Sequence, residues 1–387
     1  MTIALSRRAF IQASLSTAGG LMVAAFAPEF AGATTVNGEP WSSEAGKAPD
    51  EVNAFVVIDP DNSVTLRVAK SDMGQGVLTS MAMILAEELE CDFATVKVEY
   101  ASAHRNLVDN NVYQSMGTGG SRSVRSSRVF LQQAGASARA RLVAAAAARW
   151  GVEPAACVAT NGVVRHDASG RSATFGELAA DAAGVALVGE PAIKTPGEFK
   201  LIGKEVKRID TTLKSTGAAR FGIDTRLPGM AYAAIANCPV FGGTLKSYDF
   251  PAISKRRGII ATLPVTNGVA VVADNFWRAK EALQAMPVEW DFGPAGSTDS
   301  EEFRAEYRAA LDGPLADGGG HGDVHAAFAQ PVKTVEALYE VPYLAHAPME
   351  PLNATAHWRE DRIDVWMGTQ APESALAYAA KAGGVDP

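Results

Sequence analysis

Cysteine is scarce in this sequence of 387 residues, which contains only Cys91, Cys157 and Cys238. An iron–sulfur cluster needs about four thiolate ligands, so this chain carries no such cluster. The odd number and the wide spacing of the three cysteines also argue against a disulfide framework.

Positive charge and metal ligands are also limited. The 43 acidic residues outnumber the 35 lysines and arginines, and the net charge is −8. An acidic chain without basic clusters is a poor partner for nucleic acid or for an anionic membrane surface. His321 with His325, and His346 with Glu350, supply two metal ligands each, whereas zinc needs three or four. We therefore expect no metal bound by side chains alone.

The first 33 residues have the three parts of an export signal. The SRRAFI motif at residues 6–11 matches the twin-arginine pattern, a mildly apolar run follows, and AGA at residues 31–33 is a cleavage signal. The alternative is an uncleaved membrane helix, which the polar residues of the run disfavour. We expect a signal peptide at residues 1–33, periplasmic localisation by the twin-arginine route, no direct membrane span, and a linker at residues 34–50.

Hydrophobic spacing predicts an α+β fold for the remainder. Short strands are expected within residues 51–70, a helix after Gly76, a strand at residues 95–101, and a long alanine-rich helix that ends near Trp150. A hairpin is expected around Asn161-Gly162, followed by a short helix at FGELAADA. From residue 206 to residue 293 the pattern predicts a compact α+β unit, and residues 294–330 read as an exposed linker.

Two glycine-rich loops are candidate binding elements. Gly74-Gln75-Gly76 offers free backbone amides at a helix start, which suits a polar cofactor but equally a plain turn. Residues 117–123, GTGGSRS, combine glycines, serine hydroxyls and Arg122 before the alanine-rich helix. That combination favours an anion site, with an ordinary loop and helix cap as the alternative. The loop has no Walker lysine in the right place, so a nucleoside triphosphatase is not expected.

Five segments occur in a characteristic order. They are MGQGVLTS (73–80), TGGSRS (118–123), RFGIDTRLPGMAYA (220–233), HAPMEP (346–351) and WMGTQAP (366–372). As an ordered set they resemble the molybdenum hydroxylases, the xanthine dehydrogenase and aldehyde oxidase family, and most of all the isoquinoline 1-oxidoreductase branch. The resemblance covers nearly all of residues 50–387. It implies molybdopterin-binding segments at residues 51–205 and 331–387 that flank an α/β hammerhead domain at residues 206–293.

The resemblance also implies a cofactor and its contacts. The cofactor would be molybdenum–molybdopterin, either without a nucleotide or in the cytosine dinucleotide form. Gly74, Gln75 and Gly76 would border the pterin, and Gln370 would face the molybdenum oxo group. The phosphate or dinucleotide would be held by the second loop, through Gly119, Gly120, Ser121, Arg122 and Ser123.

The activity that the resemblance implies is hydroxylation of an aldehyde or N-heterocycle with oxygen from water. Electrons would pass to a [2Fe–2S] small subunit, with a c-type cytochrome as a further candidate partner. The family's catalytic glutamate lies in a G-E motif near the end of a chain about twice this length, so we expect no catalytic glutamate in this chain. Gly189-Glu190 is a chance match within a linker. The alternative is a non-catalytic truncated or split subunit that binds only cofactor or partner.

Overall fold

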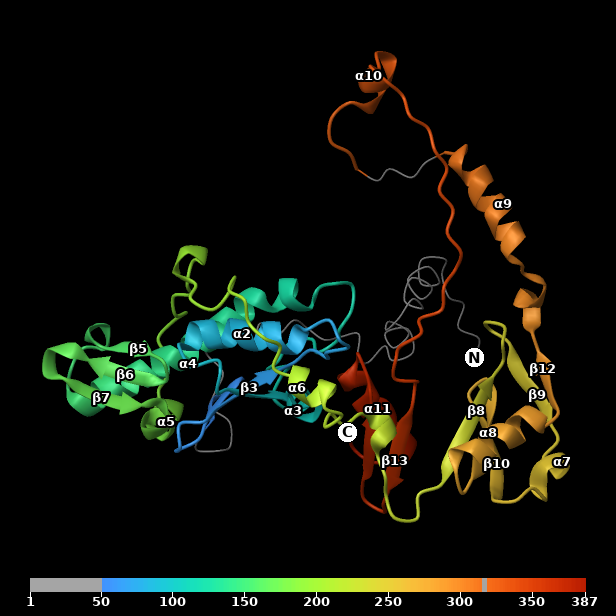
Figure 1. Cartoon of the computed structure of the whole chain (residues 1–387), viewed down its shortest axis with the longest axis horizontal. Coiled ribbons are helices and arrows are strands. Elements are labelled where there is room, and N and C mark those ends of the chain that lie inside the picture. The colour runs from blue at the N-terminus through green and yellow to red at the C-terminus, as the bar shows by residue number, and fades with distance from the viewer. Residues whose placement is uncertain (1–50, 315–318) are drawn as a thin grey trace. The chain divides into compact units, whose positions relative to one another are not determined.

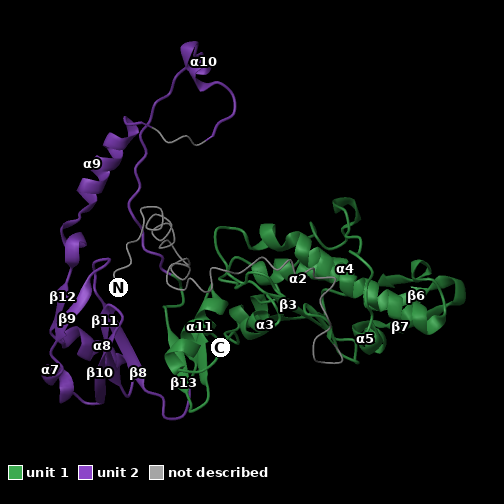
Figure 2. Ribbon diagram, turned by 180° about the vertical axis from the view of Figure 1, so that it is seen from behind, with its two compact units in different colours: residues 1–225, 348–387 green, residues 226–347 purple. Residues whose placement is uncertain are grey.

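The computed structural model describes residues 51–314 and 319–387, so the predicted signal peptide and linker lie outside the described part. The described residues form two units (Figures 1 and 2): unit 1 contains residues up to 225 and residues 348–387, and unit 2 contains residues 226–347. Both mix helices and sheets, which confirms the α+β class. Residues 206–225, which the sequence pattern placed with the hammerhead segment, group with unit 1 in the structure.

The main sheet of unit 1 has four strands in the order β1-β2-β3-β4. Its strands are β1 (Glu51–Asn53), β2 (Val56–Ile58), β3 (Val64–Val68) and β4 (Lys97–Tyr100). β3 and β4 are parallel, and the chain crosses between them through helix α2 (Val77–Leu89). Strand β3 buries alternate residues, Val64, Leu66 and Val68, as its period of two predicts.

The alanine-rich helix α4 (Ser123–Trp150) packs closely on α2. At the crossing, a Cβ atom on Gly135 would lie 2.5 Å from the carbonyl oxygen of Leu85, so only glycine fits there. Phe55 lies in the same core, in edge-to-face contact with Phe130 at 5.3 Å between ring centres. The packing of α4 on α2 sets the position of the N-terminus of α4, where the second glycine-rich loop ends.

Smaller elements complete unit 1. The strands of the sheet β5-β6-β7 are antiparallel, and the predicted hairpin at Asn161-Gly162 and the helix at residues 175–183 are present. Near the end of the chain a two-stranded ribbon precedes helix α11, which contacts α3. The elements are α3 (Ala103–Val108), η1 (Pro154–Ala156), β5 (Val158–Thr160), β6 (Val163–His166), η2 (Asp167–Ser169), β7 (Arg171–Thr174), α5 (Phe175–Ala183), η3 (Pro196–Glu198), α6 (Thr211–Ser215), η4 (Gly222–Asp224), β13 (Ala354–Trp358), β14 (Ile363–Met367) and α11 (Pro372–Gly383).

Unit 2 contains an antiparallel sheet of order β10-β11-β8, a ribbon of β9 and β12, and helix α8 packed on β8 and β11. Its core contains Ile253, Val269, Val271, Ala282 and Met286. The described residues of the predicted linker, 294–314 and 319–330, are mostly exposed but contain two helices, α9 and α10. The elements are β8 (Tyr232–Asn237), β9 (Thr244–Tyr248), α7 (Pro251–Ser254), β10 (Ile259–Val265), β11 (Gly268–Ala273), α8 (Phe276–Ala285), β12 (Val288–Asp291), η5 (Gly293–Ser297), α9 (Ser300–Leu311) and α10 (Val324–Ala329).

Within residues 51–314 and 319–387, no helix combines the length and the apolar character that a membrane crossing requires.

A buried carboxylate at the end of α2 holds the segment that follows η3. Glu87 is 3% exposed and accepts a hydrogen bond from the Lys194 ammonium at 2.6 Å. It also accepts three successive backbone N–H groups, those of Lys200, Leu201 and Ile202. Burial opposes ionisation of Glu87, but Lys194 and the three amides outweigh burial and lower its pKa to about 2.

The low pKa of Glu87 makes unfolding stability depend on acidity. The stabilisation is complete above the ordinary pKa of 4.5 and is lost as the pH falls from there toward 2. We expect Glu87→Gln to lower the free energy of unfolding by about 3 kcal/mol at pH 7, because the charge-assisted hydrogen bonds with Lys194 and three backbone amides are lost and Lys194 keeps only Glu90 as a counter-charge. Denaturant titrations from pH 7 to pH 2 measure both effects, with Glu198→Gln as an exposed control. A Glu87→Gln variant with wild-type stability and pH dependence would show that this carboxylate does not hold the segment.

Candidate functional site

Three segments that lie far apart in the sequence meet in unit 1. Ser71, in the first segment, forms hydrogen bonds with the other two. The amide of Ser71 donates to Thr118 Oγ1 at 2.9 Å, and its hydroxyl donates to the carbonyl of Thr369 at 2.7 Å. Thr118 and Gln370 are joined twice: the Thr118 amide donates to the Gln370 carbonyl, and Gln370 Nε2 donates to the Thr118 carbonyl, both at 2.8 Å. The structure therefore brings together the loops that contain Gln75, Gly119 and Gln370.

Glu373 attaches the first turn of α11 to the same junction. Its carboxylate accepts the backbone N–H of Met116 at 3.0 Å and the side-chain amide of Asn106 at 2.8 Å. Asn106 is fully buried in α3. The segment that contains Gln370 is thus held on both sides, by Ser71 before it and by Glu373 after it.

The Gly74 and Gly76 amides of the first loop are not free, contrary to the sequence-based expectation. The Asp72 carboxylate, whose side chain is 2% exposed, accepts N–H groups from Gly74 at 2.7 Å, Gly76 at 3.4 Å and Leu78 at 3.0 Å. An acidic side chain at this position also offsets the positive end of the α2 dipole. Asp72 therefore occupies the place that an anion would need at this helix.

The side chain of Gln75 is engaged within its own loop. Gln75 Oε1 accepts the backbone N–H of Met73, and Gln75 Nε2 donates to the Ser71 carbonyl at 3.1 Å. Gly74 and Gly76 both have positive φ, 104° and 84°, which only glycine adopts readily. The loop is a largely exposed turn immediately beside Ser71.

Arg208 braces the other end of this loop, and no sequence signal indicated it. Its guanidinium donates to the Gly74 carbonyl at 2.7 Å and forms two hydrogen bonds with Asp210 at 3.0 and 2.8 Å. It also lies 3.6 Å from Asp72. The hydrogen bonds from Arg208 lower the pKa of Asp210 to about 2, against the opposing effect of burial.

The second loop, residues 117–123, differs from the first, because several of its backbone N–H groups have no hydrogen-bond acceptor among the described residues. The N–H groups of Gly119, Gly120 and Ser121 donate to no acceptor in the described part of the chain. Gly120 and Ser121 have positive φ, 59° and 52°. Helix α4 follows at Ser123 with no side-chain cap and no acidic residue in its first turn. Successive unpaired amides at an uncapped helix start form a concave donor surface for an anion.

Arginines supplement these amides. Arg122, Arg125 and Arg128 form no ion pair with any described residue, and all three are exposed. A Cβ atom on Gly120 would lie 3.3 Å from Arg122 Nε, so the guanidinium lies against the loop backbone. Amides, serine hydroxyls and guanidinium groups are donors that bind phosphate. The residues present therefore fit a phosphate-bearing cofactor at this loop, and they do not fit one at the N-terminus of α2.

The remaining polar candidates have structural contacts. Glu190 contacts the side chain of Gln133 in α4, which lies ten residues after Ser123 and so about 15 Å along the helix. Glu350 accepts the backbone N–H of Ile223 at 3.2 Å and a side-chain N–H of Asn353 at 3.1 Å. Among the residues that the structure describes, no group of three His, Cys, Asp or Glu side chains is placed to hold a metal ion.

Comparison with protein families points to the same part of the chain. Residues 30–222 and residues 315–387 match two family models that are both described as a molybdopterin cofactor-binding domain. Together these matches contain the Gly-Gln-Gly loop, the Gly/Ser loop and Gln370.

Individual relatives are oxidoreductases or parts of them. The chain is 31% identical to the beta chain of isoquinoline 1-oxidoreductase of Brevundimonas diminuta, over 100% of this chain and 54% of that protein. It is 28% identical to the membrane-bound aldehyde dehydrogenase [pyrroloquinoline-quinone] of Gluconacetobacter polyoxogenes, over 87% of this chain and 44% of that protein. It is also 28% identical to a nicotinate dehydrogenase subunit of Pseudomonas putida, over 83% of this chain and 27% of that protein. The chain thus spans about half the length of these curated relatives, or less.

Among solved structures, quinoline 2-oxidoreductase from Pseudomonas putida 86 is 20% identical over 46% of this chain and 28% of that chain. Its TM-score of 0.34 is too low to compare the two site by site. The family models and the match to the isoquinoline enzyme, which covers all of this chain and 54% of that protein, lead to one conclusion. The chain belongs to the molybdenum hydroxylase family and carries its molybdopterin cofactor-binding domains.

Proposed function

We propose that this chain is the molybdopterin-binding subunit of an exported molybdenum hydroxylase that oxidises an aldehyde or an N-heterocycle with water as the oxygen source. The most direct support is the junction at Ser71, Thr118 and Gln370, where the three segments that resemble the family's cofactor-binding motifs meet. One of these segments continues into the loop whose backbone N–H groups have no acceptor among the described residues. The names of the relatives, an isoquinoline oxidoreductase, an aldehyde dehydrogenase and a nicotinate dehydrogenase, suggest the substrate classes.

When bound, the molybdenum cofactor supplies the two-electron redox chemistry and the transfer of a water-derived oxygen to an electron-poor carbon. The chain's own residues bind and orient it. The amides of Gly119, Gly120 and Ser121, with Arg122 and Ser123, would hold its phosphate. The same donors suit the pyrophosphate of a cytosine dinucleotide form, and nucleotide analysis of the released cofactor distinguishes the two forms.

Gln370 is the residue best placed to orient the rest of the cofactor. Its Nε2 is fixed on the Thr118 carbonyl, so the carboxamide plane is set and Oε1 is available as a hydrogen-bond acceptor. Gln75 and its two glycines would border the pterin as a preformed edge. Preorganised polar groups of this kind need no rearrangement when the ligand arrives.

Electron transfer would require a partner. The chain's three cysteines cannot hold an iron–sulfur cluster, so a [2Fe–2S] small subunit would accept the electrons, and a c-type cytochrome could follow in an exported enzyme. Twin-arginine export transports folded proteins, which suits an enzyme that receives its cofactor before export.

Cofactor retention tests the phosphate loop. We expect Arg122→Ala to weaken cofactor binding on the order of 10- to 100-fold, because a charge-assisted hydrogen bond contributes about 1.5–3 kcal/mol. Molybdenum and pterin per purified chain measure this, with the exposed Arg165→Ala as control. Equal cofactor content in both variants would contradict the assignment.

Turnover tests the two glutamines. In the complete enzyme, Gln75→Ala and Gln370→Ala should each lower the rate with aldehydes or N-heterocycles, since a group that orients the cofactor is lost. We expect the larger loss for Gln370→Ala, which also breaks the bond to Thr118. Rates are compared at equal molybdenum content, with Gln133→Ala on α4 as control. Wild-type rates in both glutamine variants would refute these roles.

Export is tested at the leader sequence. Arg7→Lys combined with Arg8→Lys should leave the precursor uncleaved in the cytoplasm, because twin-arginine transport depends on the arginine pair. Immunoblots of cytoplasmic and periplasmic fractions show the outcome, with a conservative Lys47→Arg variant in the linker as control. Normal processing of the double variant would exclude this route.

A further inference from the structure

Lys70 is a nearly buried cation beside the second loop. It lies two residues after β3 ends, is 7% exposed, and forms no ion pair with any described carboxylate. Its ammonium donates instead to two backbone carbonyls, those of Ser115 and of Gly117, the latter at 2.9 Å. Taking an ammonium group out of water is costly. The contacts that compensate for this cost therefore come from one short piece of backbone.

That piece of backbone leads directly into the phosphate loop. Residues 115–118 each form a hydrogen bond with a residue outside the loop: Lys70 binds two carbonyls, Glu373 binds the amide of residue 116, and Gln370 binds both backbone groups of residue 118. The next three residues are those with uncommitted amides. Residues 115–118, which these hydrogen bonds fix, thus lead directly into residues 119–121, whose free amides could bind an anion.

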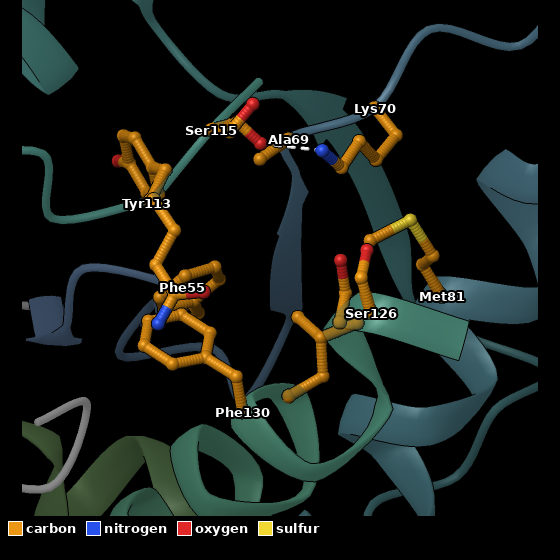
Figure 3. Close-up of a pocket in the computed structure, with 11 residues that line it drawn as sticks. Phe55, Ala69, Lys70, Met81, Tyr113, Ser115, Ser126 and Phe130 are labelled. Carbon is orange, nitrogen blue, oxygen red and sulfur yellow. Dashed lines mark hydrogen bonds between the residues drawn. The ribbon is translucent and has the colours of Figure 1, made fainter. Parts of the chain in front are cut away.

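Packing holds this segment at Met116, whose side chain is buried in the core of unit 1, but leaves an open side at Ser115. A cavity of about 130 Å³ lies beside Ser115, and the Lys70 ammonium reaches toward that residue across its rim (Figure 3). The cavity is lined in part by Phe55, Met81, Tyr113, Ser126 and Phe130. Because the cavity offers no atoms on that side to oppose movement of Ser115, the contacts with Lys70 act together with the packing of Met116 in setting the position of the carbonyls.

Two charged groups near Lys70, those of Glu373 and Arg122, affect its ammonium and lie at the same loop. Burial lowers the pKa of Lys70, the Glu373 carboxylate acts in the opposite direction, and the Arg122 guanidinium adds to the lowering. Lys70 and Arg122 are therefore close enough to repel each other, and an anion at the loop relieves that repulsion. The loop is preorganised for negative charge by a buried cation as well as by an exposed one.

We propose that Lys70 is a positioning residue of the cofactor site: its ammonium holds the Ser115 and Gly117 carbonyls and thereby sets the following amides to receive a phosphate group. This inference rests on the proposed function for the identity of the ligand. The hydrogen bonds from Lys70 to the Ser115 and Gly117 carbonyls are present in the chain without cofactor.

The first test is local hydrogen exchange in the full-length protein without cofactor. Lys70→Met removes the donors but keeps a side chain of similar length, and Lys97→Met is the control at an exposed lysine of the adjacent strand. We expect the Met116 and Thr118 amides to exchange at least about tenfold faster in Lys70→Met, since charged hydrogen bonds are lost. The control should exchange at the wild-type rate. Unchanged exchange in Lys70→Met overturns the proposal.

The second test uses inorganic pyrophosphate as a probe, with binding measured by calorimetry. Lys70→Met should weaken binding about tenfold or more, and Lys70→Arg, which keeps charge and donors, should restore part of the affinity. A merely structural lysine would change the melting temperature without this pattern. Should Lys70→Met not fold, Lys70→Gln retains one donor group and should give an intermediate loss. Equal affinity in wild type and in the neutral variant that folds would overturn the proposal.

The two proposals fail in different ways. Wild-type protein that contains no molybdenum or pterin would refute the proposed function. Faster exchange of the loop in Lys70→Met would still establish the hold of Lys70 on the carbonyls in that case.

Discussion

The paired hydrogen bonds between Thr118 and Gln370 are the contact on which the site depends. They join residues 252 positions apart in the sequence, and both use backbone atoms, so they fix the path of the chain and not only the side chains. Ser71 adds the third segment to the same contact. Without this junction, the glycine loops would be two separate turns on the surface of unit 1, and Gln370 would have no fixed relation to either.

The N-termini of α2 and α4 at this junction differ in whether an acidic side chain balances the positive end of the helix. At α2 the Asp72 carboxylate satisfies the loop amides and is itself braced by Arg208. At α4 no acidic residue is present in the first turn, and arginines and glycines take the corresponding positions. One helix start is therefore neutralised internally, and the other has neither a side-chain cap nor an acidic residue in its first turn. Two superficially similar glycine-rich loops thus have different capacities for anions.

Much of this architecture was predictable from local patterns, and the rest depends on contacts that have no local pattern. Alternation identified β3, and helical spacing after a glycine identified α2, because each of these elements buries one regular face; alanine-rich composition identified α4. The ordered motifs identified the loops that converge. The roles of Asp72, Lys70 and Glu373 were not predictable, because what distinguishes them is a hydrogen-bond partner brought near only by folding. Helix α11 was missed for a related reason: its contact with α3, through the hydrogen bond from Asn106 to Glu373, has no pattern in the local sequence.

Unit 2 is an insertion in the sequence of unit 1, and Glu350 binds the backbone of Ile223 across the two points where the chain leaves and returns. This closure has a kinetic consequence. Gln370 is synthesised only after the whole of unit 2, so the junction with Thr118 closes late and across a long loop, which carries an entropic cost. If unit 2 folds first and the Glu350 contact forms, unit 2 no longer lengthens the loop between Thr118 and Gln370, although residues 119–222 and 351–369 remain in it. The order of synthesis therefore places the closure of this junction after the synthesis of unit 2.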